Sequence, residues 1–238
     1  MLIFGINFNL YYLALARKAG SALRSTELWI YLSIVAISTA AITVNIMPFM
    51  ASFGDSLRSA AFQVSSLITT TGYSTADFNL WPGFSKGILL LLMFIGGCAG
   101  STAGGLKVSR VIILFKMVRG EIKRMIHPRS VRSVRFEDKQ LEENTLNSVG
   151  MYFAIYMICL LAIFLLLSLE PFDFETNFSA AVSCFNNVGP AFGAAGPMSS
   201  YAAYSPLSKL ALSFAMLLGR LEIFPLIIAL SPSTWLKK

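Results

Sequence analysis

The amino-acid sequence predicts an all-α polytopic membrane protein. Of its 238 residues, 55% are apolar and only 13% are charged, and the mean hydropathy is +0.67. Soluble proteins carry about a quarter charged residues. Long stretches without Asp, Glu, Lys or Arg recur along the chain, and a helix needs about 20 such residues to cross the bilayer core. The order of these stretches repeats once, which predicts two related units.

The stretches that qualify as transmembrane segments are residues 28–54, 87–106, 144–169 and 210–236. The last one contains Arg220 and Glu222, which lie two positions apart and therefore on different faces of a helix. A shorter apolar stretch, residues 1–16, lacks the basic start and the cleavage site of a signal peptide. We interpret it as the end of a preceding transmembrane helix.

The distribution of basic residues predicts the orientation. Arg17, Lys18 and Arg24 follow the first stretch, and a basic run extends from Lys107 to Arg135. The positive-inside rule therefore places residues 17–27, residues 107–143 and the C-terminus in the cytoplasm. The rule also accounts for the net charge of +7. Phe115 is the only aromatic residue in the basic run, which disfavours a nucleic-acid platform.

Residue types that carry covalent or metal chemistry are sparse. Cys98, Cys159 and Cys184 lie singly in apolar segments, which is typical of packing residues and not of a metal site or a disulfide framework. His127 lies in the basic run, where a solvated side chain is expected. The membrane segments contain no paired aspartates, Ser/His arrangement or zinc ligands, so the sequence predicts neither an enzyme nor a bound cofactor.

The internal repeat has an offset of 117 residues, the difference between Gly72 and Gly189. Each copy contains an apolar stretch, a short outer loop, a weakly polar segment that ends near its glycine, and a second apolar stretch. Under this offset Ser66 matches Ser183 and Thr70 matches Asn187. The order of elements is the same in the two copies although their identity is low.

The middle segment of the first copy is too short and polar to span the membrane. Its sequence, SLRSAAFQVSSLITTTGYST, predicts a helix of about three turns that ends at Leu67 or Ile68, because three threonines and Gly72 disfavour continuation. Such a segment enters the membrane and turns back, which is tolerated only within protein or along a watery path. Its backbone carbonyls and the negative helix end could then coordinate a dehydrated cation.

The second copy, FSAAVSCFNNVGPAFGAAGP, breaks at residues 186–190, where Pro190 removes a hydrogen-bond donor. For either Gly72 or Gly189 alone, a simple turn is an equally good interpretation. Two glycines at matching points of a repeat favour a pair of filter loops.

Residues 97–105 contain nothing larger than threonine or cysteine, in the sequence GCAGSTAGG, so a helix should break there. A stripe of small residues for close helix packing is the alternative. Arg220 is costly near the middle of an apolar stretch, by roughly 2.5 to 3.5 kcal/mol for an unpaired arginine. It acts either on the conduction path or as a tether between helices.

Three stretches resemble the Trk/Ktr/HKT superfamily of potassium transporters, and within it the bacterial TrkH-type membrane subunit. They are TTTGYSTADF at 69–78, GGCAGSTAGGLKVSR at 96–110 and NNVGPAFG at 186–193, with LGRLEIFP at 218–225 as support. The resemblance covers essentially the whole chain. It implies repeated span, re-entrant pore loop and span units of a potassium-channel-like pore, and a function in potassium uptake.

The family has four such repeats, and the resemblance implies that this chain holds the third and fourth. The expected divisions are the end of a preceding repeat at 1–27, the third repeat at 28–118, a cytoplasmic basic linker at 119–143 and the fourth repeat at 144–238. The alternative is an incomplete half that assembles with other chains and does not transport by itself.

The resemblance also implies roles for individual residues. The potassium filter would comprise Thr70, Thr71, Gly72, Tyr73, Asn187, Val188 and Gly189. Potassium ions would bind at Thr70, Thr71, Asn187 and Val188. The gate would be an intramembrane loop beneath the filter, made by Gly97, Gly100, Ser101, Thr102, Gly104 and Gly105 together with Arg220.

The linker at 119–143 predicts a short strand or hairpin around Val131, Val134 and Phe136, or alternatively a disordered basic segment that binds anionic lipid. The resemblance implies that this linker and the C-terminal SPSTWLKK dock a cytoplasmic nucleotide-binding regulatory subunit of the TrkA type. It further implies a homodimer of the full-length membrane subunit in the bacterial inner membrane. Potassium against sodium selectivity, and channel against symporter action, stay open.

Overall fold

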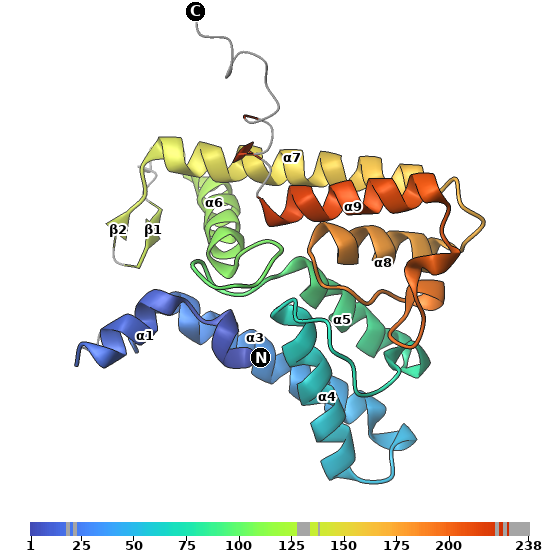
Figure 1. Ribbon diagram of the computed structural model, residues 1–238. Helices are drawn as coiled ribbons and strands as arrows, with labels where there is room; N and C mark the ends of the chain where they lie inside the picture. Colours follow the sequence, from blue (N-terminus) through green and yellow to red (C-terminus); the bar gives the residue numbers. More distant parts are fainter. Residues whose placement is uncertain are drawn as a thin grey trace, which may run out of the picture.

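The computed structural model describes residues 1–17, 20, 23–127, 134–137, 139–221, 224–225 and 228. Almost all regular structure in these residues is helical (Figure 1). The α-helices are α1 (Phe8–Leu15), α3 (Thr26–Ile46), α4 (Phe53–Ile68), α5 (Gly83–Phe94), α6 (Val108–Ile126), α7 (Glu143–Leu167), α8 (Phe174–Phe185) and α9 (Pro206–Arg220). Single 3₁₀ turns occur at Leu2–Gly5, Met47–Phe49, Phe78–Leu80, Gly193–Ala195 and Tyr201–Ala203.

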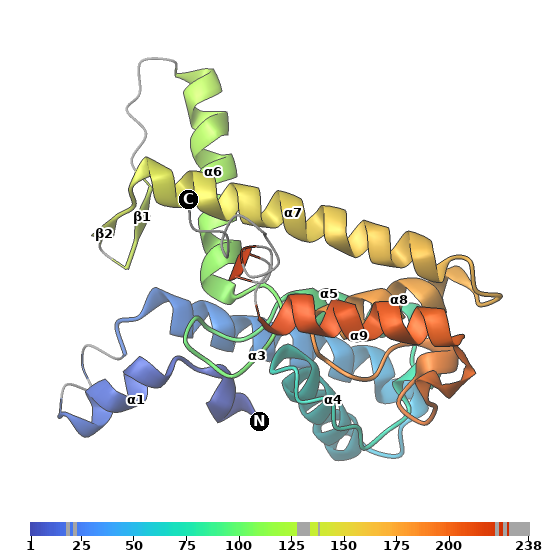
Figure 2. The ribbon, with the colours of Figure 1, turned by 45° about the horizontal axis from the view of Figure 1, so that its top comes forward.

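The helices form two units in chain order. Helices α3, α4 and α5 pack against one another, as do α7, α8 and α9, and the two units meet where α5 packs on α8. In Figure 1 the second unit lies above the first, with α7 along the top edge. Figure 2 shows α6 projecting from the junction between the units, where it contacts both α3 and α7.

Local sequence signals fix several helix ends. Ser52 caps α4 through its side chain, which accepts the N–H of Asp55 at 3.2 Å. The helix therefore begins at Phe53 and is longer than the three turns predicted, although it ends at Ile68 as expected. Helix α3 ends earlier than the apolar stretch 28–54, because Pro48 lies in the 3₁₀ turn that follows it.

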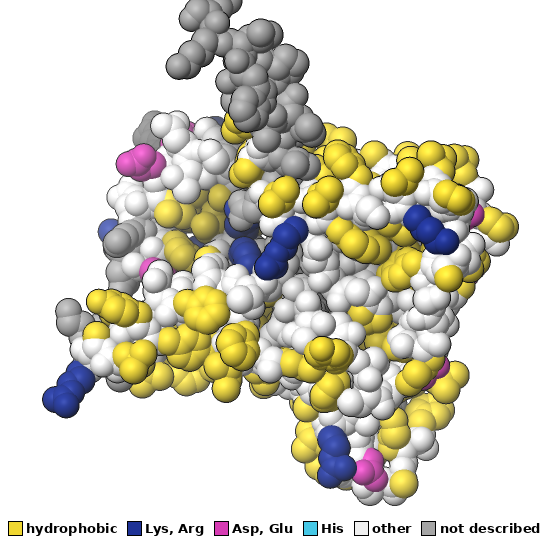
Figure 3. Space-filling view, viewed as in Figure 1, with side chains coloured by type: hydrophobic (Ala, Val, Ile, Leu, Met, Phe, Trp, Pro, Cys, Tyr) yellow, Lys and Arg dark blue, Asp and Glu magenta, His cyan; other side chains and the backbone are white. Residues whose placement is uncertain are grey.

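Two described helices are long and apolar enough to cross a membrane: α3 with the turn that follows it, Thr26–Phe49, and α7. Helix α5 is apolar but shorter. The outward faces of both long helices are apolar, since Ile37, Val44, Ile158 and Leu165 are each about two-thirds exposed. Apolar side chains also cover much of the surface seen in Figure 3. This surface suits a lipid environment.

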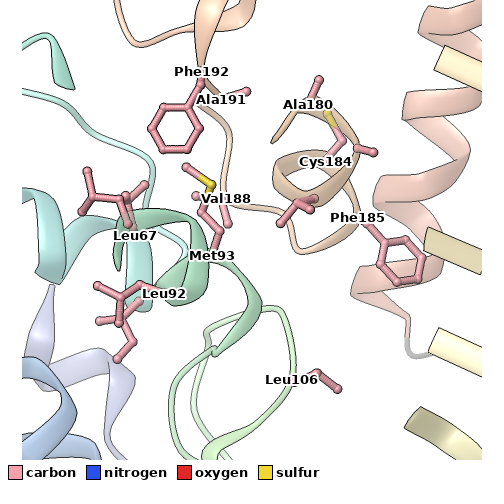
Figure 4. Close-up of a cluster of buried hydrophobic side chains, with 14 of the residues drawn as sticks. Leu67, Leu92, Met93, Leu106, Ala180, Cys184, Phe185, Val188, Ala191 and Phe192 are labelled. Carbon is pink, nitrogen blue, oxygen red and sulfur yellow. The ribbon is translucent and has the colours of Figure 1, made fainter. Parts of the chain in front are cut away.

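The hydrophobic core lies between the two units. Figure 4 shows Leu67 of α4 and Met93 of α5 in one cluster with Val188 and Phe192, which follow α8. The ring of Phe192 packs edge to face on Phe78, with centroids 5.4 Å apart. The loops that follow α4 and α8 are thus held against each other by buried apolar side chains.

The segments outside the long helices are also predicted from the sequence. Residues 1–16 do not form one helix, because Asn7 accepts the Asn9 N–H and starts α1 after a separate 3₁₀ turn. The predicted hairpin is present as β1 (Arg135–Phe136) and β2 (Lys139–Gln140), which pair antiparallel. The predictions on Val131, Glu222 and residues 231–238 fall outside the described residues. The cysteines are free, with Cys98 and Cys184 buried.

Candidate functional site

Helices α4 and α8 each end in a short loop, and the two loops share one hydrogen-bond pattern. They are residues 69–73, the first loop, and residues 186–190, the second loop. The Thr71 N–H donates to the Ser66 carbonyl at 2.9 Å, and the Val188 N–H donates to the Ser183 carbonyl at 2.9 Å. Both pairs are related by the 117-residue offset found in the sequence.

The same serines close the far end of each loop. Ser66 Oγ donates to the Tyr73 carbonyl at 2.6 Å, and Ser183 Oγ donates to the Pro190 carbonyl at 2.7 Å. Both serines are fully buried. These two carbonyls therefore face their own helices, whereas Tyr73 is 70% exposed.

Matching residues in the two loops have left-handed backbone angles. Thr70 has a φ of 50° and Asn187 of 57°, while Gly72 has 77° and Gly189 has 111°. Such angles cost of order 1–3 kcal/mol for residues other than glycine, and they persist only when the surroundings enforce them. At Gly72 a side chain would in addition overlap the carbonyl of Val188, so the first and second loops touch.

Several carbonyl oxygens of the two loops are left without a donor. Among the described residues, no hydrogen bond is donated to the carbonyls of Thr70, Thr71, Gly72, Asn187 and Val188. The Gly189 carbonyl differs, because it accepts the Tyr201 hydroxyl at 2.8 Å. Both helices also direct their negative C-terminal ends at this place. Unpaired carbonyls beside two negative helix ends have the chemistry that a cation site requires.

The α5–α6 loop, residues 95–107, interrupts what would otherwise be one helix. Its ends are pinned together, since Gly96 donates to the Leu106 carbonyl at 2.8 Å and Leu106 donates to the Phe94 carbonyl at 3.1 Å. The Cys98 N–H donates to the Gly5 carbonyl at 2.8 Å. The break predicted from the small residues at 97–105 is therefore present, and the loop is folded on itself.

The α5–α6 loop lies directly against both loops of the site. The Gly104 N–H donates to Thr70 Oγ1 at 2.8 Å. A side chain at Gly104 would overlap the carbonyl of Asn186, which is backbone that cannot yield cheaply. Only glycine allows this approach, so the α5–α6 loop blocks one side of the first and second loops.

A cavity of about 400 Å³ lies on the other side of the α5–α6 loop. It is lined by Gly100, Ser101, Thr102, Ala103, Gly104, Gly105, Lys107, Arg110, Tyr152, Gly219 and Arg220. Arg220 donates from Nη1 to the Thr102 carbonyl at 2.9 Å. The guanidinium of Arg110 stands 4.1 Å from the centre of the Tyr152 ring. Figure 3 shows basic side chains at the middle of this face.

The structure brings several of the site residues predicted from the sequence together at the junction of the two units. Thr70 contacts Gly104, Gly72 contacts Val188, and Thr102 contacts Arg220. Gly97 packs against the N-terminal segment at Gly5 and not against either loop.

Sequence reasoning missed Lys107, Arg110, Asn186 and Glu27. From the sequence, Lys107 and Arg110 are only two of the many basic residues expected on the cytoplasmic side. Asn186 precedes the left-handed residue of its loop, and its amide oxygen accepts the Tyr156 hydroxyl at 2.8 Å. Glu27 carries no sequence signal beyond an acidic residue in the first turn of a helix.

An all-helical arrangement with two matched carbonyl loops and an irregular segment packed against them is typical of ion-transport proteins. The family model described as TrkH, "Cation transport protein", matches residues 23–237. The chain therefore belongs to the TrkH family of cation transport proteins.

Individual relatives agree with this membership. The Trk system potassium uptake protein TrkG of Escherichia coli K12 is 35% identical over 98% of this chain. TrkH of Salmonella typhimurium is 38% identical over 75% of it. The crystal structure of the potassium transporter TrkH from Vibrio parahaemolyticus matches 99% of this chain at 32% identity, with a TM-score of 0.90.

The chain spans about half the length of these proteins or less. The matched region covers 48% of TrkG, 37% of the Salmonella TrkH and 51% of the Vibrio chain.

Proposed function

We propose that this chain supplies two of the four repeats of a potassium-conducting pore in the bacterial inner membrane, with its C-terminus in the cytoplasm. The observation that carries the proposal is the matched pair of loops, which touch each other and hold unpaired carbonyls next to two helix C-termini. Relatives named as potassium uptake proteins support the choice of ion.

In this proposal carbonyl oxygens replace the water that a potassium ion sheds on entering the filter. Thr70, Thr71, Asn187 and Val188 would contact the ion. Gly72 would provide the left-handed turn of the first loop where it meets the second loop. The Tyr73 carbonyl is held by Ser66 and the Gly189 carbonyl by Tyr201, so these two residues would shape the outer end of the filter. Transport would run down the electrochemical gradient without covalent chemistry or a cofactor.

The α5–α6 loop would be the gate. It binds Thr70 Oγ1 through Gly104, and its opposite side is held by Arg220. Gly97, Gly100, Ser101, Thr102, Gly104 and Gly105 would form the part that moves. A fixed positive charge at Arg220 would raise the barrier for a cation that passes below the filter. We therefore propose that Arg220 stabilises the closed state of the gate.

Partners follow from the same assignment. A cytoplasmic nucleotide-binding subunit of the TrkA type would dock near β1 and β2, which project on the side of α6 (Figure 2). The full-length membrane subunit would form a homodimer.

A second candidate is an assembly-only half that does not transport by itself.

Complementation tests the proposal. A potassium-uptake-deficient bacterium would receive this chain alone, or the chain joined to the first two repeats of a TrkH-family relative. We expect growth at low potassium and rubidium uptake from the joined protein, and uptake that resists competing sodium. No uptake by the joined protein would contradict the proposal, and uptake by this chain alone would exclude the assembly-only half.

A matched pair of glycine variants makes this test specific. Gly72→Ala should abolish uptake, because the residue has a left-handed φ and touches the Val188 carbonyl. Gly87→Ala in α5 meets no atom within 4 Å and should leave uptake intact. Equal uptake by both variants in membranes with equal amounts of protein would rule out the filter assignment.

A further inference from the structure

We propose that Glu27 is the positioning residue that holds the α5–α6 loop in its blocking conformation. The inference rests on the proposed function in one respect, namely that this loop is the gate. It assigns a specific residue on another helix to the control of the loop.

Glu27 lies in the first turn of α3 and is only 3% exposed. One of its carboxylate oxygens, Oε1, accepts two backbone hydrogen bonds. The Ala99 N–H donates to it at 2.7 Å, and the Ser109 N–H donates to it at 3.1 Å. Ala99 belongs to the α5–α6 loop and Ser109 to the first turn of α6, so a single oxygen fastens the loop to the helix that follows it.

The N-terminus of α6 needs such a partner. Its own N-cap residue, Lys107, makes no side-chain cap hydrogen bond. The first N–H groups of a helix have no partner within the helix, and a negative charge near them is favourable. Glu27 supplies that acceptor from α3. A buried carboxylate is destabilising unless it is hydrogen-bonded. Moving Ala99 away would remove one of the two hydrogen bonds that stabilise the buried carboxylate of Glu27, so the free energy of the open loop would be higher.

The residues beside Glu27 extend this connection to the cytoplasmic hairpin. Ser25 is the N-cap of α3, and its hydroxyl donates to Glu137 Oε1 at 2.7 Å. Lys116 of α6 donates to the Arg135 carbonyl at 2.7 Å. The hairpin β1–β2 is thereby attached to both helices that Glu27 joins. A partner that displaces the hairpin would pull on the α3 N-cap two residues from Glu27.

Cys98 is a built-in reporter for this arrangement. It precedes Ala99 and is 1% exposed in the folded loop. With Cys159, Cys184 and the cysteines of the joined repeats replaced, the rate of maleimide labelling at Cys98 reports release of the loop. Glu27→Asp keeps a negative charge near the thiol but shortens the side chain that holds Ala99, so it separates release of the loop from a change in thiol reactivity.

The experiment compares Cys98 labelling in membranes that contain the chain joined to the first two repeats of a relative. We expect Glu27→Ala to accelerate labelling by about tenfold, consistent with loss of hydrogen bonds to a charged group. Glu27→Gln keeps an acceptor oxygen and should fall between Glu27→Ala and the parent. Glu143→Ala is the matched control, because Glu143 is an exposed acidic residue in the first turn of α7.

Labelling of the Glu27 variants at the rate of Glu143→Ala would overturn the inference. If Glu27→Ala does not fold, as judged by size-exclusion chromatography, Glu27→Asp decides by the same criterion. Rubidium uptake separates the two proposals: faster labelling with unchanged uptake keeps the role of Glu27 but removes the gate assignment. Unchanged labelling with unchanged uptake removes the role of Glu27 and leaves the gate assignment as it stands.

Discussion

The two units of the molecule share a helix-and-loop plan but differ in what packs behind each loop. In the first unit the irregular residues 95–107, between α5 and α6, contact the first loop, whereas in the second unit the helix α9 (Pro206–Arg220) contacts the second loop. The first and second loops themselves match in hydrogen bonds and backbone angles. The difference between the units therefore lies behind the loops and not in them.

This difference changes what each loop is attached to. Thr70 and Asn187 occupy equivalent positions, and each is bonded through its side chain to the next segment of its own unit. Thr70 Oγ1 accepts the Gly104 N–H of the α5–α6 loop at 2.8 Å, whereas Asn187 Nδ2 donates to the Met216 carbonyl of α9 at 3.0 Å. One loop is fastened to an irregular segment and the other to a regular helix. In the proposed gate, the attachment to the irregular segment would release and the attachment to α9 would stay.

The largest effect should come from crowding the irregular segment. Gly104→Val should abolish rubidium uptake by the joined protein, because the new side chain meets the Asn186 carbonyl, and overpacking costs typically ~1–3 kcal/mol. Gly120→Ala in α6 meets no atom within 4 Å and should be neutral. Normal uptake by Gly104→Val would mean that the α5–α6 loop does not rest against the second loop.

The two attachments should respond differently when each is removed. Thr70→Ala leaves the Gly104 N–H without its acceptor, at a cost of roughly 1–3 kcal/mol, so uptake should rise as the α5–α6 loop is released. Asn187→Ala frees the second loop from α9, so discrimination between rubidium and sodium should fall. Thr70→Ser keeps the hydroxyl and serves as control. The comparison fails if both alanine variants change uptake and discrimination in the same way.

A smaller effect is expected at the cavity. Arg220→Ala removes the hydrogen bond to the Thr102 carbonyl together with a positive charge below the filter. Rubidium uptake should rise severalfold in a direct flux assay, and Arg220→Lys should rise less because it keeps the charge. Unchanged flux in Arg220→Ala would leave only the role of a tether between helices.

The smallest effect concerns the second unit alone. Glu170 accepts the Ser205 N–H at 3.1 Å and the Ser208 hydroxyl at 2.5 Å. The side chains of Ser205 and Ser208, ahead of the Ser205 N–H, lower the pKa of the Glu170 carboxyl below its ordinary value. A pKa that is lower in the folded protein than in the unfolded chain means that the ionised carboxylate stabilises the fold. This contribution is complete above the unfolded pKa of Glu, about 4.3, and is lost as pH falls through the folded pKa.

Thermal unfolding of the parent should therefore shift to lower temperature below that pH, and Glu170→Gln should show a weaker shift. Glu175→Gln is the control, because Glu175 pairs with Lys86 and not with Ser205 or Ser208. Parallel pH curves for parent and Glu170→Gln would contradict the assignment.

Much of the fold follows from local features of the sequence. The end of α4 at Ile68 and the interruption between α5 and α6 are predictable from threonines and glycines, which have a low helix propensity. The predicted start of α4 is wrong because Ser52 acts as a cap and begins the helix earlier than the polar segment suggests. The prediction of one helix at 1–16 is wrong because Asn7 starts a new helix in an apolar context.

The candidate site is predictable only in outline. The repeat offset alone pairs Thr70 with Asn187 and Gly72 with Gly189. It cannot identify Glu27, because the two N–H groups that this carboxylate accepts come from residues 72 and 82 positions away. Nor can it distinguish an arginine that contacts Thr102 from one that contacts lipid.

The sequence by itself determined the apolar composition, the helix breaks and the repeat, because these depend on neighbouring residues and on a period that can be counted. Tertiary structure decided which surfaces meet: the α5–α6 loop against the first and second loops, and the carboxylate of Glu27 against the start of α6. Those contacts join distant parts of the chain, and their energy depends on burial and distance that no local pattern specifies.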